Sequence, residues 1–269
     1  GKSTVLNMLI GFMRPDSGEI LLDGENMRNL DFRSFRRHLA VVPQETILFS
    51  GTVRQNITYG SADVTEEELW QVLKAANLDE VVKNLPQGLD TNLGEHGGRL
   101  SGGQRQRIGI ARALILHPEF VVCDEPVSAL DVSVQSQIIN LLLDLKEKEN
   151  LSYLFIAHDI GVVRYISDRI GVMYLGYLFE ECPTEELFRN PLHPYTKTLL
   201  SSVPVIDASG AAKKERTLIQ GELPSPLSPP SGCVFRTRCP YAKPICAEQC
   251  PEKKDVGGGH HVMCHLYDE

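Results

Sequence analysis

The sequence predicts an α/β fold built on a parallel sheet, because short apolar runs alternate with stretches of helical periodicity. Apolar runs of strand length occur at residues 41–42, 120–123 and 152–157. Such runs suit strands that are buried on both faces, as in a parallel sheet. From residue 52 to about 116 the pattern is mostly helical. We therefore expect a parallel-sheet core with an inserted helical subdomain.

The remaining elements of the first 180 residues follow from turn signals and periodicity. Residues 5–12 form an apolar helical pattern at the start of the chain. Gly18 and the Asp23-Gly24 pair are turn signals between short apolar runs, which predicts a β-rich arm. Residues 134–145 are strongly apolar-periodic, so a helix is expected between the second and third core strands.

The run at residues 100–131 combines a glycine-rich turn with a strand that ends in two acids. Small residues before a helical pattern let backbone N–H groups approach an anionic phosphate, and here they are Ser101, Gly102, Gly103 and Gln104. The apolar strand then delivers Asp124 and Glu125 at its end. One acid can hold Mg²⁺ through its water shell, and the other can polarise an attacking water. The run therefore predicts phosphate chemistry.

This run resembles the ATP-binding-cassette (ABC) ATPases, whose signature is LSGGQ and whose Walker B strand ends in Asp-Glu. The plainer alternative is a glycine-rich turn followed by an amphipathic helix. The resemblance implies a P-loop NTPase fold in which two such domains pair head to tail, so that Ser101 to Gln104 of one face the ATP of the other. It also implies Mg²⁺ binding by Asp124 and general-base catalysis by Glu125.

The start of the chain, Gly1-Lys2-Ser3-Thr4, matches the last four positions of the P-loop pattern and precedes an apolar helix. The resemblance implies that Lys2 reaches the β- and γ-phosphates and that Ser3 ligates Mg²⁺. The upstream half of the loop, the strand before it and an adenine-stacking aromatic residue are missing. This predicts an N-terminally incomplete fragment, and one alternative is a remnant without ATPase activity.

Three further family elements occur in the expected order. Gln44 follows an apolar strand and resembles the Q-loop glutamine, which would sense the γ-phosphate, Mg²⁺ or water. His158 follows another strand and resembles the switch histidine that contacts the γ-phosphate. The SALD run ending at Asp131 resembles the D-loop, through which the two subunits communicate. Together they imply an ATP site with Mg²⁺ held by Ser3, Asp124 and Gln44.

The part after residue 180 differs in composition and predicts an extension, residues 181–269, on a nucleotide-binding domain, residues 1–180. Residues 203–232 are rich in Pro, Ser and Gly and read as an extended connector. The run Asn190-Pro191-Leu192-His193-Pro194-Tyr195 resembles the NPxHPYT segment of the ATPases that power oligopeptide, dipeptide and nickel importers.

Five of the seven cysteines follow the connector. In a reducing cytosol such clustering favours a metal site over disulfides. The resemblance to the importers' C-terminal extension implies a [4Fe–4S] cluster, with thiolate ligands at Cys233, Cys239, Cys246 and Cys264 and with Cys250 as an extra. Zinc would accept the same thiolates, and packed cysteines without metal are the third interpretation.

The class of ABC protein that the sequence resembles changes along the chain. Residues 45–57 and 85–95 resemble the exporters of the same superfamily, whereas the DEPVSALD run and everything after it resemble the peptide importers. We therefore expect a mosaic whose seam lies between about residues 99 and 117. Because the Q-loop and helical subdomain grip the membrane partner, the front half favours an exporter membrane domain and the tail favours separate importer subunits.

Composition limits the partners. The net charge of −8 and the absence of a long Lys/Arg block argue against nucleic acid. No apolar run approaches the ~20 residues that cross a bilayer, so we expect a protein held at the cytoplasmic face of the membrane by transmembrane permease subunits. The expected function is ATP hydrolysis that powers oligopeptide or dipeptide import. The alternatives are an exporter nucleotide-binding domain and, without transport, a DNA-repair or translation ATPase.

Overall fold

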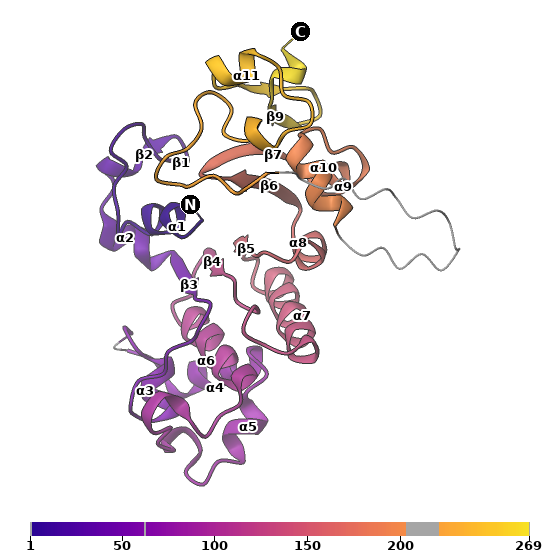
Figure 1. The fold of residues 1–269 in the computed structure, drawn as a ribbon. Helices are drawn as coiled ribbons and strands as arrows, with labels where there is room; N and C mark the ends of the chain where they lie inside the picture. The colour runs from indigo at the N-terminus through magenta and orange to yellow at the C-terminus, as the bar shows by residue number, and fades with distance from the viewer. Residues whose placement is uncertain (1, 62, 203–220, 269) are drawn as a thin grey trace, which may run out of the picture. The chain divides into compact units, whose positions relative to one another are not determined.

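The structure is a computed structural model, and it describes residues 2–61, 63–202 and 221–268 (Figure 1). The chain forms two compact units, one spanning Ser3–His158 and the other formed by the first two residues together with Asp159–Glu269. The expected α/β class is confirmed. The functional division at residue 180 stays a prediction.

The core of the first unit is a parallel sheet in the order β3-β4-β5, with bounds Leu39–Val42, Phe120–Asp124 and Ser152–Ile156. The three predicted strands are therefore confirmed. In register, Val42 lies opposite Cys123, and Asp124 lies opposite Ile156. The carboxyl ends of all three strands consequently meet at one edge of the sheet.

Helix α1, Lys2–Leu9, packs its buried Leu6 in a core cluster with Leu39 and Val122 of the sheet. The sequence predicted this helix to run through residue 12, and that is wrong by one turn. Gly11 adopts a left-handed φ of +76°, and the N–H of Phe12 bonds back to the carbonyl of Asn7 at 2.8 Å. A left-handed glycine just after a helix closes its last turn, so the helix ends earlier than its apolar pattern.

The β-rich arm contains the predicted hairpin. Strands β1, Leu21–Leu22, and β2, Glu25–Asn26, pair antiparallel across the Asp23-Gly24 turn. Both turn residues have positive φ, +50° and +83°, as the tight turns favoured in hairpins require. A short 3-10 helix, Met27–Asn29, and helix α2, Phe32–Arg37, lead from the arm into β3.

The region between β3 and β4 is helical, as expected. It contains α3, Val53–Ile57; α4, Glu66–Ala75; α5, Asp79–Lys83; the 3-10 turns Gly88–Asp90 and Glu95–Gly97; and α6, Gly102–Leu114. Thr52, Thr65 and Ser101 each close a capping box at the start of α3, α4 and α6. Between β4 and β5 lies α7, Val132–Lys148, which confirms the predicted helix and extends it by a few residues at each end.

The second unit contains an antiparallel sheet in the order β6-β7-β9-β8, with bounds Arg169–Tyr174, Tyr177–Pro183, His261–Met263 and Lys253–Asp255. Its helices are α8, Ile160–Ile166; α9, Thr184–Arg189; α10, Pro194–Ser201; and α11, Ile245–Glu248, with 3-10 turns at Arg236–Arg238 and His265–Tyr267. Strand β9 comes from the tail and pairs with β7, so the tail belongs to the sheet.

Part of the predicted connector, residues 203–220, lies outside the described residues, and residues 221–232 contain turns without helix or strand. Across the described ranges, no helix is long and apolar enough to cross a membrane.

Candidate functional site

Three predicted catalytic residues follow the three neighbouring core strands. Gln44 lies two residues after β3, Glu125 comes directly after β4, and His158 lies two residues after β5. Because the strands are parallel and adjacent, these residues lie along the carboxyl edge of one sheet, where open α/β sheets bind ligands. The three motifs, which are far apart in the sequence, therefore lie in a row along one edge of the sheet.

Glu125 and His158 are in direct contact. The Nδ1 of His158 lies 3.1 Å from the Oε2 of Glu125. The Glu125 side chain is 19% exposed and that of His158 is 67% exposed, so the carboxylate is sheltered while the imidazole faces outward. The backbone N–H of Glu125 donates to the carbonyl of Ile156 at 2.9 Å, which fixes the backbone of Glu125 to the end of β5.

The backbone of Glu125 is left-handed, with φ of +47°, which few residues other than glycine adopt. Ser128 stabilises this turn, since its Oγ donates to the carbonyl of Glu125 at 3.0 Å. Such conformations concentrate at functional sites because the surrounding structure must hold them. A carboxylate fixed beside an imidazole at a ligand-binding edge is the arrangement that a general base requires.

The glycine-rich turn forms the first turn of α6. The Oγ of Ser101 accepts a bond from the N–H of Gln104, and the Oε1 of Gln104 accepts one from the N–H of Ser101. Gly103 also allows close helix packing, because a Cβ there would lie 2.6 Å from the Cγ1 of Val134 on α7. The four predicted phosphate-binding residues thus begin a 13-residue helix, where unsatisfied N–H groups favour anions.

Asp131 begins α7, since its carboxylate accepts a bond from the N–H of Val134 at 3.0 Å. The sequence did not single out Gln135, which fixes the loop before it. The Nε2 of Gln135 donates to the carbonyls of Val127 and Leu130, at 3.0 and 3.1 Å. A glutamine inside a helix gives no signal of such contacts.

Lys2, Ser3 and Thr4 form the first turn of α1, and Gly1 lies outside the described residues. The predicted Mg²⁺ ligands Ser3, Asp124 and Gln44 offer a hydroxyl, a carboxylate and an amide oxygen. Oxygen ligands of these kinds are the ones that Mg²⁺ prefers.

The four predicted tail cysteines are brought together. Cys233, Cys239, Cys246 and Cys264 line one pocket, together with His193 and His265, whereas Cys250 is exposed and outside it. Burial raises the pKa of Cys264 to about 11 and also raises the pKa of Cys233 and Cys239. In the part of the chain that the structure describes, no three His, Cys, Asp or Glu side chains are placed to hold one metal ion. The expected iron–sulfur cluster is therefore not supported by a preformed metal site.

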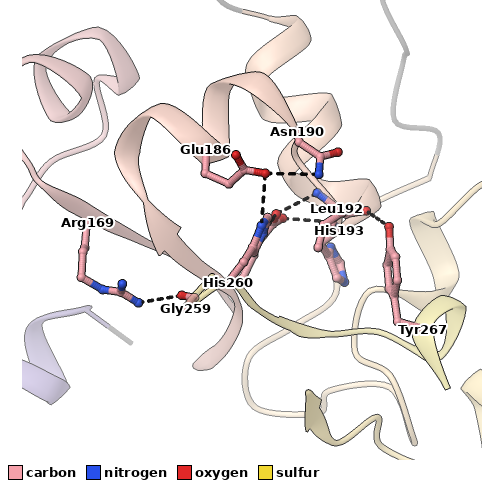
Figure 2. A network of polar contacts seen from close by, with 9 residues as sticks. Arg169, Glu186, Asn190, Leu192, His193, Gly259, His260 and Tyr267 are labelled. Carbon is pink, nitrogen blue, oxygen red and sulfur yellow. Dashed lines mark hydrogen bonds and ion pairs between the residues drawn. The ribbon is translucent and has the colours of Figure 1, made fainter. Parts of the chain in front are cut away.

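A buried carboxyl group holds the NPLHPY segment, and sequence reasoning missed it. Glu180 on β7 is fully buried, and it accepts bonds from the backbone N–H groups of Leu192 (2.7 Å) and His193 (2.9 Å). The Nε2 of His260 lies 2.8 Å from the same carboxyl group. Figure 2 shows His260 beside Glu186, and the Nδ1 of His260 lies 3.9 Å from the Oε1 of Glu186. The Glu180 side chain thus contacts both the tail and the NPLHPY segment.

His193 begins helix α10. Its Nδ1 accepts a bond from the N–H of Tyr195 at 3.0 Å, and Pro194 occupies the first helical position, where its missing N–H costs nothing. Its ring stacks on Phe179, with centroids 4.2 Å apart. Burial, with Lys197 as a smaller cause, lowers the pKa of His193 to about 3. The imidazole is therefore neutral and serves as a helix cap.

His193 predicts a pH dependence of stability. The unfolded chain takes up a proton below the ordinary histidine pKa of 6.5, whereas the folded chain does so only near 3. Stability is therefore retained above pH 6.5 and lost as pH falls, by about 2 kcal/mol at pH 5. His193→Asn keeps a capping acceptor without titrating, so urea unfolding at pH 7 and pH 5 is expected to show a smaller loss in the variant. Equal losses would contradict this.

The sheet edge, the P-loop-like helix and the capped glycine turn define a P-loop ATPase. The sequence profile of the family described as "ABC transporter" matches residues 1–128, and that of "Oligopeptide/dipeptide transporter, C-terminal region" matches residues 179–246. The chain belongs to the ABC transporter family of ATP-binding proteins, which are ATPases coupled to transport.

Relatives support this assignment over nearly the whole chain. The oligopeptide transport ATP-binding protein AppF of Bacillus subtilis (strain 168) is 48% identical over 99% of this chain and 82% of its own length. The oligopeptide transport ATP-binding protein OppF of Salmonella typhimurium is 44% identical, over 93% of this chain and 76% of its own. A solved structure of a bacterial Atm1-family ABC exporter with ATP bound is 34% identical with a TM-score of 0.64, and the match covers 71% of this chain and 33% of that chain.

Proposed function

We propose that this chain is the ATP-hydrolysing subunit that powers oligopeptide or dipeptide import, bound to permease subunits at the cytoplasmic face of the membrane. The observation that carries the proposal is the combination of an ABC ATPase site and an NPLHPY tail in one chain, as the two profile matches describe. The printed names of relatives that match over 99% of the chain agree with it.

In the proposed mechanism two subunits pair head to tail around ATP. Lys2 binds the β- and γ-phosphates, and Glu125 takes a proton from the attacking water while His158 orients the γ-phosphate. When bound, Mg²⁺ neutralises charge that develops on the phosphates, and Ser3, Asp124 and Gln44 would hold it. Ser101 to Gln104 cover the ATP of the partner. Asp131 ends the D-loop, through which the two subunits communicate. Closure on ATP and opening after hydrolysis drive the permease.

The test is reconstitution of the chain with peptide permease subunits and a peptide-binding protein. We expect a complex in which loaded peptide stimulates MgATP hydrolysis. A chain that hydrolyses MgATP but neither co-purifies with the permease nor responds to peptide would contradict the import function and leave the ATPase assignment intact.

An exporter partner is the second candidate, and two observations favour it. Residues 45–57 and 85–95 resemble exporters, and the solved exporter structure matches over most of the chain. Offering both membrane partners to the same chain separates the candidates, because the mosaic hypothesis expects binding to an exporter membrane domain through the front half. Binding to the peptide permease alone would reject it.

A [4Fe–4S] cluster in the tail is a further proposal, supported by the four thiols that line one pocket. Zinc would accept the same four thiolates. A cluster instead takes each of its four cysteines at a different iron. Anaerobically purified protein should be brown and contain iron, and colourless, iron-free protein with intact tail thiols would overturn this.

A further inference from the structure

The segment that contains Gln44 is attached to helix α6 by a buried side chain. Gln106 is 3% exposed and lies on the second turn of α6. Its Nε2 donates to the carbonyl of Pro43 at 3.3 Å, and its Oε1 accepts a bond from the Oγ1 of Thr46 at 2.9 Å. These two contacts lie immediately before Gln44 and two residues after it, so one amide fixes the backbone on both sides of the Q-loop glutamine.

A glycine on the same face of α6 admits this segment. Gly109 lies three residues after Gln106, and therefore on the same face of the helix. A Cβ at Gly109 would lie 2.4 Å from the Oγ1 of Thr46 and 2.9 Å from its Cγ2. Any larger residue would push Thr46 away from Gln106. The hydrogen bonds and the close approach are independent observations of one contact.

The same helix also holds the chain that follows. Arg112 donates to the carbonyl of Ile47 at 3.1 Å and to the carbonyl of Asn56 at 2.8 Å. The guanidinium also lies over the ring of Phe49, 5.1 Å from its centroid. Helix α6 therefore binds this segment at several points between residues 43 and 56.

We propose that Gln106 is a positioning residue, which fixes Gln44 to the helix that begins with the glycine-rich signature. A buried amide whose donor and acceptor are both satisfied resists separation, because moving either side leaves a polar group unpaired. The residue that senses Mg²⁺ at one ATP and the turn that covers the partner's ATP consequently move together. This inference rests on the proposed role of Gln44.

Thr46 offers the mildest test. Thr46→Val removes the hydroxyl that donates to Gln106 and keeps the side-chain shape. Hydrogen exchange at the backbone amide of Gln44 is therefore expected to become faster, and the Mg²⁺ concentration that half-saturates ATP hydrolysis is expected to rise about tenfold. Thr46→Ser keeps the hydroxyl and should restore the wild-type value. The matched control is Thr91→Val in the same helical region. Thr91 is also buried, and this substitution also removes one hydroxyl hydrogen bond, which the Thr91 hydroxyl accepts from the N–H of Gln87.

Two more variants complete the experiment on the full chain. Gln106→Leu and Gly109→Ala should shift the Mg²⁺ dependence in the same direction as Thr46→Val, and circular dichroism checks that each is folded. Gln44→Ala is measured in parallel. If it leaves the Mg²⁺ dependence unchanged, the proposed role of Gln44 fails. If it shifts the dependence while Thr46→Val matches Thr91→Val, the positioning role of Gln106 is overturned and the role of Gln44 stands.

Discussion

Glu125→Gln is expected to lower the rate of ATP hydrolysis by about 10²- to 10⁴-fold, which is the usual contribution of a general base. The amide keeps the size of the side chain and its distance from His158, but it cannot accept a proton from water. ATP binding should persist, because the predicted phosphate and Mg²⁺ contacts come from other residues. Phosphate release and retention of nucleotide by a closed dimer are the two measurements.

The chain supplies a matched control next to the same strand, at its opposite end. Glu119 precedes β4, and its Oε1 lies 2.9 Å from the Nδ1 of His38, so it forms a second Glu–His pair beside the sheet. Both members of that pair are exposed. Glu119→Gln should leave hydrolysis unchanged, because it lies at the opposite end of β4 from Glu125. If Glu125→Gln and Glu119→Gln both turn over ATP at the wild-type rate, Glu125 is not the base.

The row of predicted catalytic residues could be read from the sequence because each of them comes within two positions of the end of a strand. In a parallel sheet, adjacent strands place their carboxyl ends together, so Gln44, Glu125 and His158 needed only the correct strand order to become neighbours. Caps were also readable, since Ser101 and Gln104 stand at the spacing of a capping box. The end of α1 was not, because the apolar pattern continues past the point where Gly11 turns left-handed.

Contacts between distant residues were not readable from sequence. Gln106 bonds to Pro43, 63 residues away, and His260 bonds to Glu180, 80 residues away. Neither partner stands at a spacing that local geometry relates to the other, and polar residues in amphipathic elements are usually solvent-facing. Such pairs are decided by tertiary packing, which buries them only after the sheet and helices have assembled. The four tail cysteines that line one pocket are the four that the resemblance to the importers implied, and a metal site there stays a prediction.

Glu180→Ala is expected to lower the free energy of unfolding of the second unit by about 3–5 kcal/mol, the usual result of removing one partner from a buried polar pair. The substitution removes the hydrogen-bond partner of the Leu192 N–H, the His193 N–H and His260, since all three bond to this one carboxyl group. Glu180→Gln should cost less. Its Oε1 can keep two of the contacts, and only the His193 N–H would then face an amide donor.

Glu181, the neighbouring acid on β7, provides the matched control. Glu181 pairs with Lys253 at 2.8 Å and with Arg169 at 3.3 Å, but its side chain is 31% exposed, so Glu181→Ala should cost at most about 1 kcal/mol. Urea unfolding gives the free energies, and hydrogen exchange at the Leu192 and His193 amides shows where protection is lost. Equal losses for the two alanine variants would mean that burial of Glu180 does not organise the NPLHPY segment. A large loss confined to Glu180→Ala, with fast exchange at those two amides, is expected because the Glu180 carboxyl group accepts bonds from both amides and also contacts His260 of the tail.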